Sequence, residues 1–92
     1  MKQIRAHVVI TGLVQGVFFR ASTQDMAKEL ALTGYVRNCP DGTVEAVFEG
    51  PEEKINEAAD WCHSGPAGAR VEKADIEFSE FKNEFNDFVV RY

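Results

Sequence analysis

A nine-residue segment, residues 12–20, combines the backbone freedom and the side chain that bind an anion. It reads Gly-Leu-Val-Gln-Gly-Val-Phe-Phe-Arg, so that Gly12 and Gly16 bracket a short turn and Arg20 closes it. Glycine reaches backbone angles that a side chain forbids, which lets successive N–H groups face one centre. Arg20 adds a planar fork of donors that fits phosphate or carboxylate oxygens. The segment therefore predicts an anion site, and the alternative is an ordinary turn followed by a solvated arginine.

A second polar residue, Asn38, precedes the Pro-Asp-Gly sequence of a predicted turn at residues 40–42. By itself, this position favours a side-chain amide that caps the turn. A contribution to the anion site is the alternative.

The composition indicates which kinds of partner the protein can bind and how many domains it forms. The 15 acidic and 10 basic side chains give a formal net charge of −5, which disfavours binding to a nucleic-acid backbone. With 45% hydrophobic residues, 92 residues predict one domain over 1–92 with a single core.

No segment reaches the ~20 apolar residues of a membrane span, and residues 1–7 lack the pattern of a signal peptide. We therefore expect a cytoplasmic protein with no membrane or nucleic-acid partner.

Four further residues have side chains that could take part in chemistry. Cys39 and Cys62 lack the spacing of a redox or metal motif, which predicts two free thiols; a disulfide between them is the alternative. His7 falls on the polar face of the first predicted strand, which favours a surface position. Arg91 is predicted either to pair with an acid on the sheet surface or to help hold the loop at residues 12–20.

The first half of the chain predicts a strand, a helix and a hairpin. Apolar residues alternate over residues 4–10, as in a strand with one buried face. Helical spacing from Phe19 to Leu30 predicts a helix, which we expect Gly34 to end. Residues 35–39 and 44–48 then predict two strands joined by a tight turn.

The second half predicts a helix and two strands. Pro51 suits the first turn of the helix. Alternation at residues 74–78 indicates a strand with Val71 at a bulge, and residues 88–92 form a last strand. The order βαββαβ with a terminal strand predicts an α+β, ferredoxin-like fold, in which an antiparallel sheet of four to five strands carries two helices on one face.

Two stretches of the chain resemble the acylphosphatase family. Residues 12–20 match the family signature Gly-x-Val-Gln-Gly-Val-x-Phe-Arg, and residues 34–44 match its second signature, Gly-Tyr-Val-Arg-Asn-x-x-x-Gly-x-Val. Gly50 stands at its expected distance, and residues 88–92, Phe-Val-Val-Arg-Tyr, are similar to the family's terminal strand. The resemblance covers essentially the whole chain.

This resemblance implies a monomeric hydrolase that cleaves acyl phosphates to carboxylate and inorganic phosphate, without a metal or an organic cofactor. It places phosphate binding on Arg20 and on the backbone N–H groups of the preceding loop, formed by Gln15, Gly16, Val17, Phe18 and Phe19. It assigns to Asn38 the orientation of the attacking water. The alternative is a non-catalytic regulatory module that keeps the phosphate site.

Overall fold

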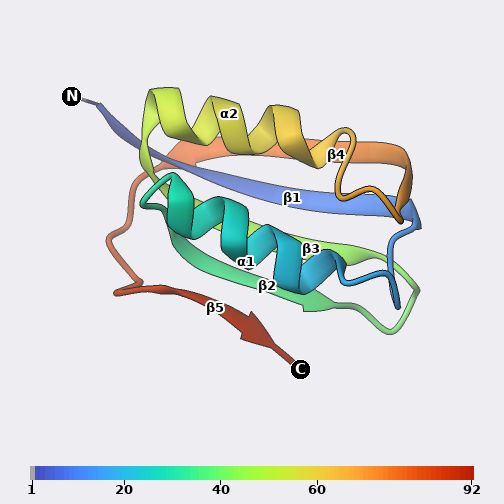
Figure 1. Ribbon diagram of the computed structural model, residues 1–92. Coiled ribbons are helices and arrows are strands. Elements are labelled where there is room, and N and C mark those ends of the chain that lie inside the picture. The colour runs from blue at the N-terminus through green and yellow to red at the C-terminus, as the bar shows by residue number, and fades with distance from the viewer. Residues whose placement is uncertain (1) are drawn as a thin grey trace.

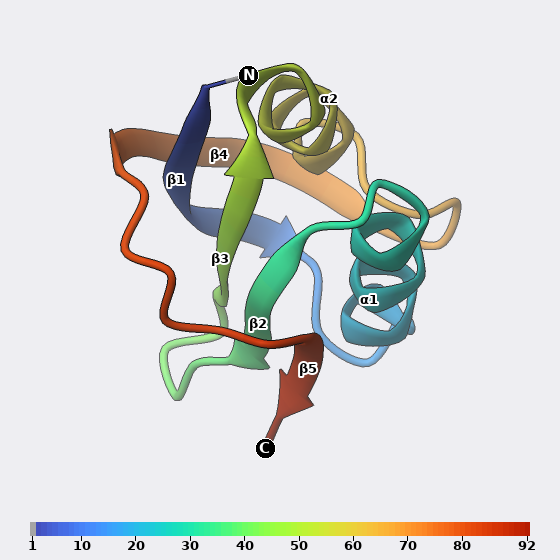
Figure 2. The same ribbon diagram turned by 90° about the vertical axis from the view of Figure 1, so that its left-hand side faces the viewer.

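The computed structural model describes residues 2–92, which form a five-stranded sheet with both helices on one face (Figure 1, Figure 2). The strands are β1 (Gln3–Leu13), β2 (Thr33–Asn38), β3 (Val44–Pro51), β4 (Arg70–Glu80) and β5 (Phe88–Arg91), and the helices are α1 (Phe19–Glu29) and α2 (Glu52–Cys62). Their order in the sheet is β4-β1-β3-β2-β5. The ferredoxin-like α+β prediction is confirmed.

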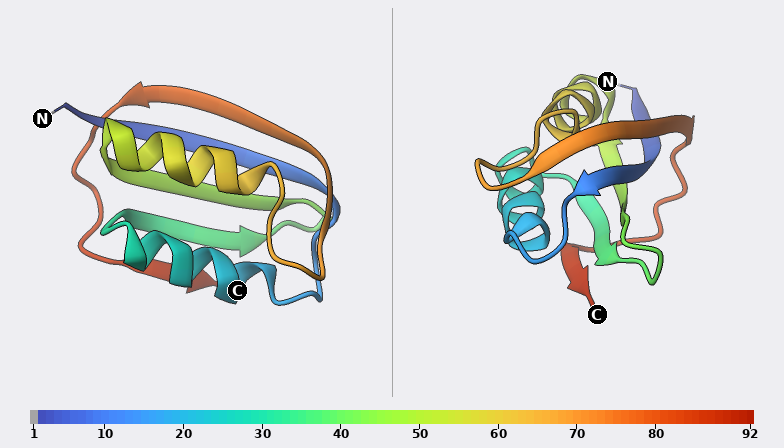
Figure 3. Two further views of the ribbon diagram at one scale, coloured as in Figure 1. Left: turned by 45° about the horizontal axis from the view of Figure 1, so that its top comes forward. Right: turned by 90° about the vertical axis from the view of Figure 1, so that its right-hand side faces the viewer.

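Figure 3 shows from two sides that both helices lie on the same face of the sheet, and the core lies between these two layers. The apolar residues of β1 alternate with half-exposed ones, because successive side chains of a strand point to opposite faces. The central position of β1 and β3 leaves their helix-facing side chains fully enclosed. The buried hydrophobic side chains include Ala6, Val8, Ile10, Val14, Phe19, Ala27, Val36, Val44, Ala46, Phe48, Ile55, Ala58, Cys62 and Phe88.

The sheet is mixed, which corrects the expectation of a purely antiparallel one. β5 pairs with β2 in parallel, with Gly34 opposite Phe88 and Arg37 opposite Arg91. The reason is topological: β4 and β5 lie at opposite edges of the sheet, so the connection between them crosses every other strand. It crosses on the face without helices (Figure 2) and returns the chain to the end of the sheet where β2 starts.

Helix α1 does not end at Gly34, so that prediction was wrong. The helix ends at Glu29, and Ala31, with a φ of 57°, takes the left-handed position after it. The N–H of Leu32 bonds back to the carbonyl of Ala27 at 2.9 Å, as in a Schellman motif. Gly34 lies within β2, where an added Cβ would come 1.8 Å from the carbonyl oxygen of Val47. Close approach of two strands, rather than helix termination, requires this glycine.

Three strands are longer than predicted: β1 extends to Leu13, β3 extends to Pro51, and β4 runs from Arg70 to Glu80 rather than over residues 74–78. Pro51 stands one position earlier than expected, as the N-cap residue of α2. The bulge is confirmed next to Val71, because Thr11 pairs with Lys73 and Gly12 with Val71, which leaves one β4 residue unpaired. Cys39 and Cys62 are free thiols. None of the helices in residues 2–92 is long and apolar enough to cross a membrane.

Candidate active site

The loop between β1 and α1 is bent by two residues in the left-handed region. Gly16 has a φ of 74°, and Phe18 has a φ of 60°. A left-handed conformation is uncommon for a phenylalanine and marks local strain, which clusters at functional sites. Such turns direct neighbouring N–H groups toward one point. The loop therefore contains two of the left-handed residues from which anion-binding turns are built.

Helix α1 begins at this loop without a side-chain cap. Its N-cap residue is Phe18, whose side chain is 84% exposed, and no side chain in residues 2–92 caps the first turn. The first N–H groups of a helix have no partner within the helix, and the helix dipole places partial positive charge there. No acidic residue occupies the first turn. The N-terminus of α1 is thus open to an anion.

Two contacts hold this loop against the rest of the fold. Gly12 lets β1 approach β4, because a Cβ on Gly12 would lie 2.2 Å from the carbonyl oxygen of Arg70. The side chain of Gln15 donates from Nε2 to the carbonyls of Cys39 and Thr43, both at 2.9 Å. These bonds fix the loop against the β2–β3 turn. They occupy the side chain of Gln15, so only the backbone of Gln15 is left to face a ligand.

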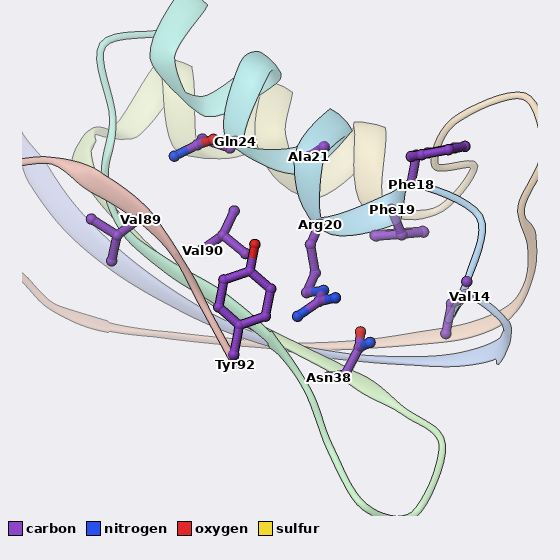
Figure 4. A pocket seen from close by; sticks show the side chains of 11 residues that line it. Val14, Phe18, Phe19, Arg20, Ala21, Gln24, Asn38, Val89, Val90 and Tyr92 are labelled. Carbon is purple, nitrogen blue, oxygen red and sulfur yellow. The ribbon is translucent and has the colours of Figure 1, made fainter.

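A cavity of about 660 Å³ opens between the start of α1 and the ends of β2 and β5 (Figure 4). It brings together five of the residues that the sequence assigned to the site, namely Gly16, Phe18, Phe19, Arg20 and Asn38. Gln15 and Val17 are not among its lining residues. The other lining residues are Val14, Ala21, Gln24, Val89, Val90 and Tyr92. The sequence analysis missed these; the only signal for the last three was the resemblance of the terminal strand.

The Arg20 side chain extends from α1 toward the sheet and is held by the end of the chain (Figure 4). Its Nη1 donates to the carbonyl oxygen of Arg91 at 3.3 Å, and its Cζ lies 4.6 Å from the centre of the Tyr92 ring. Within residues 2–92, no carboxylate side chain forms an ion pair with Arg20. These contacts orient the guanidinium without neutralising it, so its charge remains available to an anion.

Asn38, the last residue of β2, is among the residues that line the same cavity. Its Oδ1 is buried, and no donor in the described part of the chain bonds to it. The turn that follows does not depend on this amide, because Cys39 N–H bonds to the Thr43 carbonyl and Asp41 accepts from the Thr43 N–H. A buried acceptor without a partner costs about 1–3 kcal/mol, a cost that a bound water or ligand donor removes. Figure 4 shows the amide beside the Arg20 guanidinium.

His7 and the Arg91 side chain lie on the opposite face of the sheet. His7 Nε2 is 2.8 Å from Oε2 of Glu45, and the guanidinium of Arg91 stacks 3.9 Å above the Tyr35 ring. Burial alone would raise the pKa of Glu45, but hydrogen bonds from His7, Arg37 and Tyr35 outweigh it and hold that pKa at about 2. Arg91 thus supports the site through its backbone, and neither side chain reaches the cavity.

Comparison with known proteins places the chain in a family. The family model described as acylphosphatase matches residues 6–90. The acylphosphatase of Pelotomaculum thermopropionicum is 45% identical over 92 residues, with 100% of both chains covered. The chain belongs to the acylphosphatase family. This confirms the resemblance seen in the two signatures and the assignment to the acylphosphatase hydrolases.

Solved structures of family members have the same fold over the same length. An acylphosphatase from Coxiella burnetii superposes with a TM-score of 0.92 at 39% identity, covering 98% of this chain and 94% of its own. The acylphosphatase from Bacillus subtilis gives a TM-score of 0.92 at 29% identity, covering 97% and 99%. The loop and the cavity described above therefore belong to a fold that the family shares.

Proposed function

We propose that this protein hydrolyses acyl phosphates, with the loop and Arg20 binding the phosphate and Asn38 orienting the attacking water. One observation carries the proposal: within residues 2–92, a guanidinium without an acidic partner, a helix start without a side-chain cap, and Asn38, whose Oδ1 has no hydrogen-bond partner, line one cavity. The backbone N–H groups of residues 15–19 and the Arg20 fork surround the phosphoryl oxygens. The acyl half of the substrate extends toward Ala21 and Val90, which line the rest of the cavity.

The proposed reaction needs positioning and charge stabilisation more than acid–base groups. Phosphoryl transfer spreads negative charge over the equatorial oxygens, which a guanidinium and oriented N–H groups stabilise. A water held by Asn38 Oδ1 attacks phosphorus, the P–O bond to the acyl group breaks, and the carboxylate leaves with the electron pair. The proton of the water passes to a phosphate oxygen of the substrate. No protonation of the leaving group is required, which suits a loop that has no Asp, Glu or His in residues 12–20.

Several broader assignments complete the proposal. The protein acts as a monomer in the cytoplasm, as one domain over residues 1–92, and uses neither a metal nor an organic cofactor. The net charge of −5 supports a small-molecule partner over a nucleic acid.

The test is hydrolysis of benzoyl phosphate by the purified protein, with and without a chelator. We expect turnover to survive chelation. In Asn38→Ala, turnover should fall by ~10²-fold or more while inorganic phosphate still binds, as for the loss of one oriented group. Asn56→Ala is the matched control, because Asn56 is exposed on α2 and outside the cavity. Phosphate binding without any turnover in the wild type would favour the non-catalytic module instead.

A further inference from the structure

The face of the sheet without helices carries a buried carboxylate that the proposed mechanism does not use. Glu49, in β3, is only 1% exposed, although it stands on the face opposite the core. An ionised carboxylate is costly to bury unless donors surround it. Glu49 has three: Arg5 Nη1 at 3.2 Å, the backbone N–H of Lys82 at 2.8 Å and the backbone N–H of Glu84 at 3.2 Å.

Two of these donors come from the connection between β4 and β5, residues 81–87, which we call the strap. Figure 2 shows it crossing the helix-free face on its way from β4 to β5. Between the two bonded N–H groups lies Asn83, with a φ of 53°. A left-handed residue between two others turns the flanking N–H groups to the same side, which forms a backbone nest for an anion. The carboxylate of Glu49 fills this nest.

Aromatic contacts reinforce the same anchor. Phe85 of the strap lies under the Arg5 guanidinium, 5.6 Å from its ring centre, and packs edge-on against Tyr35 at 6.0 Å. At the end of the strap, the Asp87 carbonyl accepts from the N–H of Gly34 at 3.0 Å. The strap is therefore fixed near its start, at Lys82 and Glu84, and at its end, at Asp87. The next residue begins β5.

The strap leads directly into β5, whose first residue, Phe88, is also held in the core by stacking on Phe48 at 5.3 Å. Within residues 2–92, β5 has four residues, lies at the edge of the sheet and pairs with β2 alone. The Gln24 side chain adds a single bond to the Phe88 carbonyl at 3.1 Å. Three residues further on, about 10 Å along the strand, β5 supplies the Arg91 carbonyl and leads to the Tyr92 ring that together hold Arg20.

We propose that Glu49 is a positioning residue for Arg20: its carboxylate fixes the strap, the strap fixes β5, and β5 orients the guanidinium. The inference rests on the proposed function, because it concerns the arginine to which phosphate binding is assigned there. Both oxygens of Glu49 accept backbone hydrogen bonds. Glutamine has the same shape but replaces one acceptor with a donor, so Glu49→Gln sets an NH₂ group against an N–H of the strap.

The experiment measures the dissociation constant of inorganic phosphate by calorimetry, together with kcat and KM for benzoyl phosphate. Circular dichroism gives the folded fraction at the assay temperature. We expect Glu49→Gln to weaken phosphate binding roughly 3- to 10-fold in the folded protein, a size typical of residues that act through a neighbouring element. In an Arg20→Gln background the same change should have less than about a twofold effect, since coupled residues are not additive.

A second pair of variants tests the strap without touching Glu49. Asn83→Val disfavours the left-handed conformation of the nest, whereas Asn83→Gly keeps it available. We expect the valine variant to weaken phosphate binding in the same direction as Glu49→Gln and the glycine variant to do so far less. This pair keeps the inference testable if Glu49→Gln does not fold.

Two results would overturn the inference. In one, Glu49→Gln lowers the melting temperature but leaves phosphate affinity of the folded protein unchanged, which makes the role purely structural. In the other, the losses from Glu49→Gln and Arg20→Gln simply add. Failure of the proposed function is a separate outcome: the wild type binds phosphate with full dependence on Glu49 but hydrolyses no acyl phosphate. If the Arg20→Gln variant bound phosphate as tightly as the wild type, both the inference and the proposed function would be overturned.

Discussion

Arg20 donates from Nη1 to the backbone carbonyl of Arg91, 71 residues later in the sequence, at 3.3 Å. The bond ties the start of α1 to the last strand and aims a guanidinium into the cavity without pairing it to an acid. A carbonyl and an aromatic ring orient the charge, whereas a carboxylate would also neutralise it. The arrangement suits a site whose ligand is itself an anion.

Arg20→Gln and Arg20→Lys should both weaken phosphate binding and lower kcat/KM for benzoyl phosphate by ~10-fold or more, because neither keeps the bidentate fork. Arg37→Gln is the matched control. It removes the same charge from the helix-free face, where Arg37 pairs with Glu45. Equal losses in Arg20→Gln and Arg37→Gln would mean that overall charge, and not the fork, governs binding. Initial rates and phosphate calorimetry give the comparison.

Gln15→Leu should loosen the loop. The change leaves the carbonyls of Cys39 and Thr43 without the Nε2 donor, which costs about 1–2 kcal/mol of stability. The loop then samples other conformations, so phosphate affinity should fall as well. Urea unfolding measures the first effect and calorimetry the second. The control is Gln3→Leu, at an exposed position of β1, which should change neither the stability nor the phosphate affinity. Unaltered phosphate affinity in Gln15→Leu would show that the Gln15 hydrogen bonds have no role in binding.

Gly34→Ala should destabilise the protein far more than Gly42→Ala. Both glycines have positive φ, 139° and 93°, so both alanines are strained. At Gly42 nothing lies within 4 Å of the added Cβ, and we expect a loss of about 1–2 kcal/mol. At Gly34 the Cβ meets the Val47 carbonyl, which should raise the loss to about 3 kcal/mol or more. Comparable urea midpoints for the two variants would contradict the close approach of β2 and β3.

Glu45→Gln should destabilise the protein in a pH-dependent way. The pKa of Glu45 is lowered from 4.5 to about 2 in the folded protein. A lowered pKa adds stability that is fully present above the unfolded value and is lost as the pH falls through the folded value. The difference in unfolding free energy between wild type and variant should therefore be constant above about pH 5 and shrink toward pH 2. A difference that stayed the same down to pH 2 would show that the ion pairs add nothing. Urea unfolding at a series of pH values measures it.

The order of the helices and strands could be predicted from the amino-acid sequence alone. Alternation at residues 4–10, helical spacing after Phe19 and the Pro-Asp-Gly turn are local patterns, and local sterics and burial fix what they form. The two signatures singled out Arg20 and Asn38, which line one cavity in the structure, and their roles stay predictions. These features were readable because each depends on residues close together in the chain.

The contacts between these elements appear only in the folded chain. The parallel pairing of β5, the close approach at Gly34, and the pinning of the loop by Gln15 all join segments distant in sequence. The structure also explained Glu49, which follows three apolar residues in a strand and looks like a surface glutamate until the strap covers it. No local pattern encodes such contacts, because their free energy comes from burial and hydrogen bonding that arise only when the whole chain is folded.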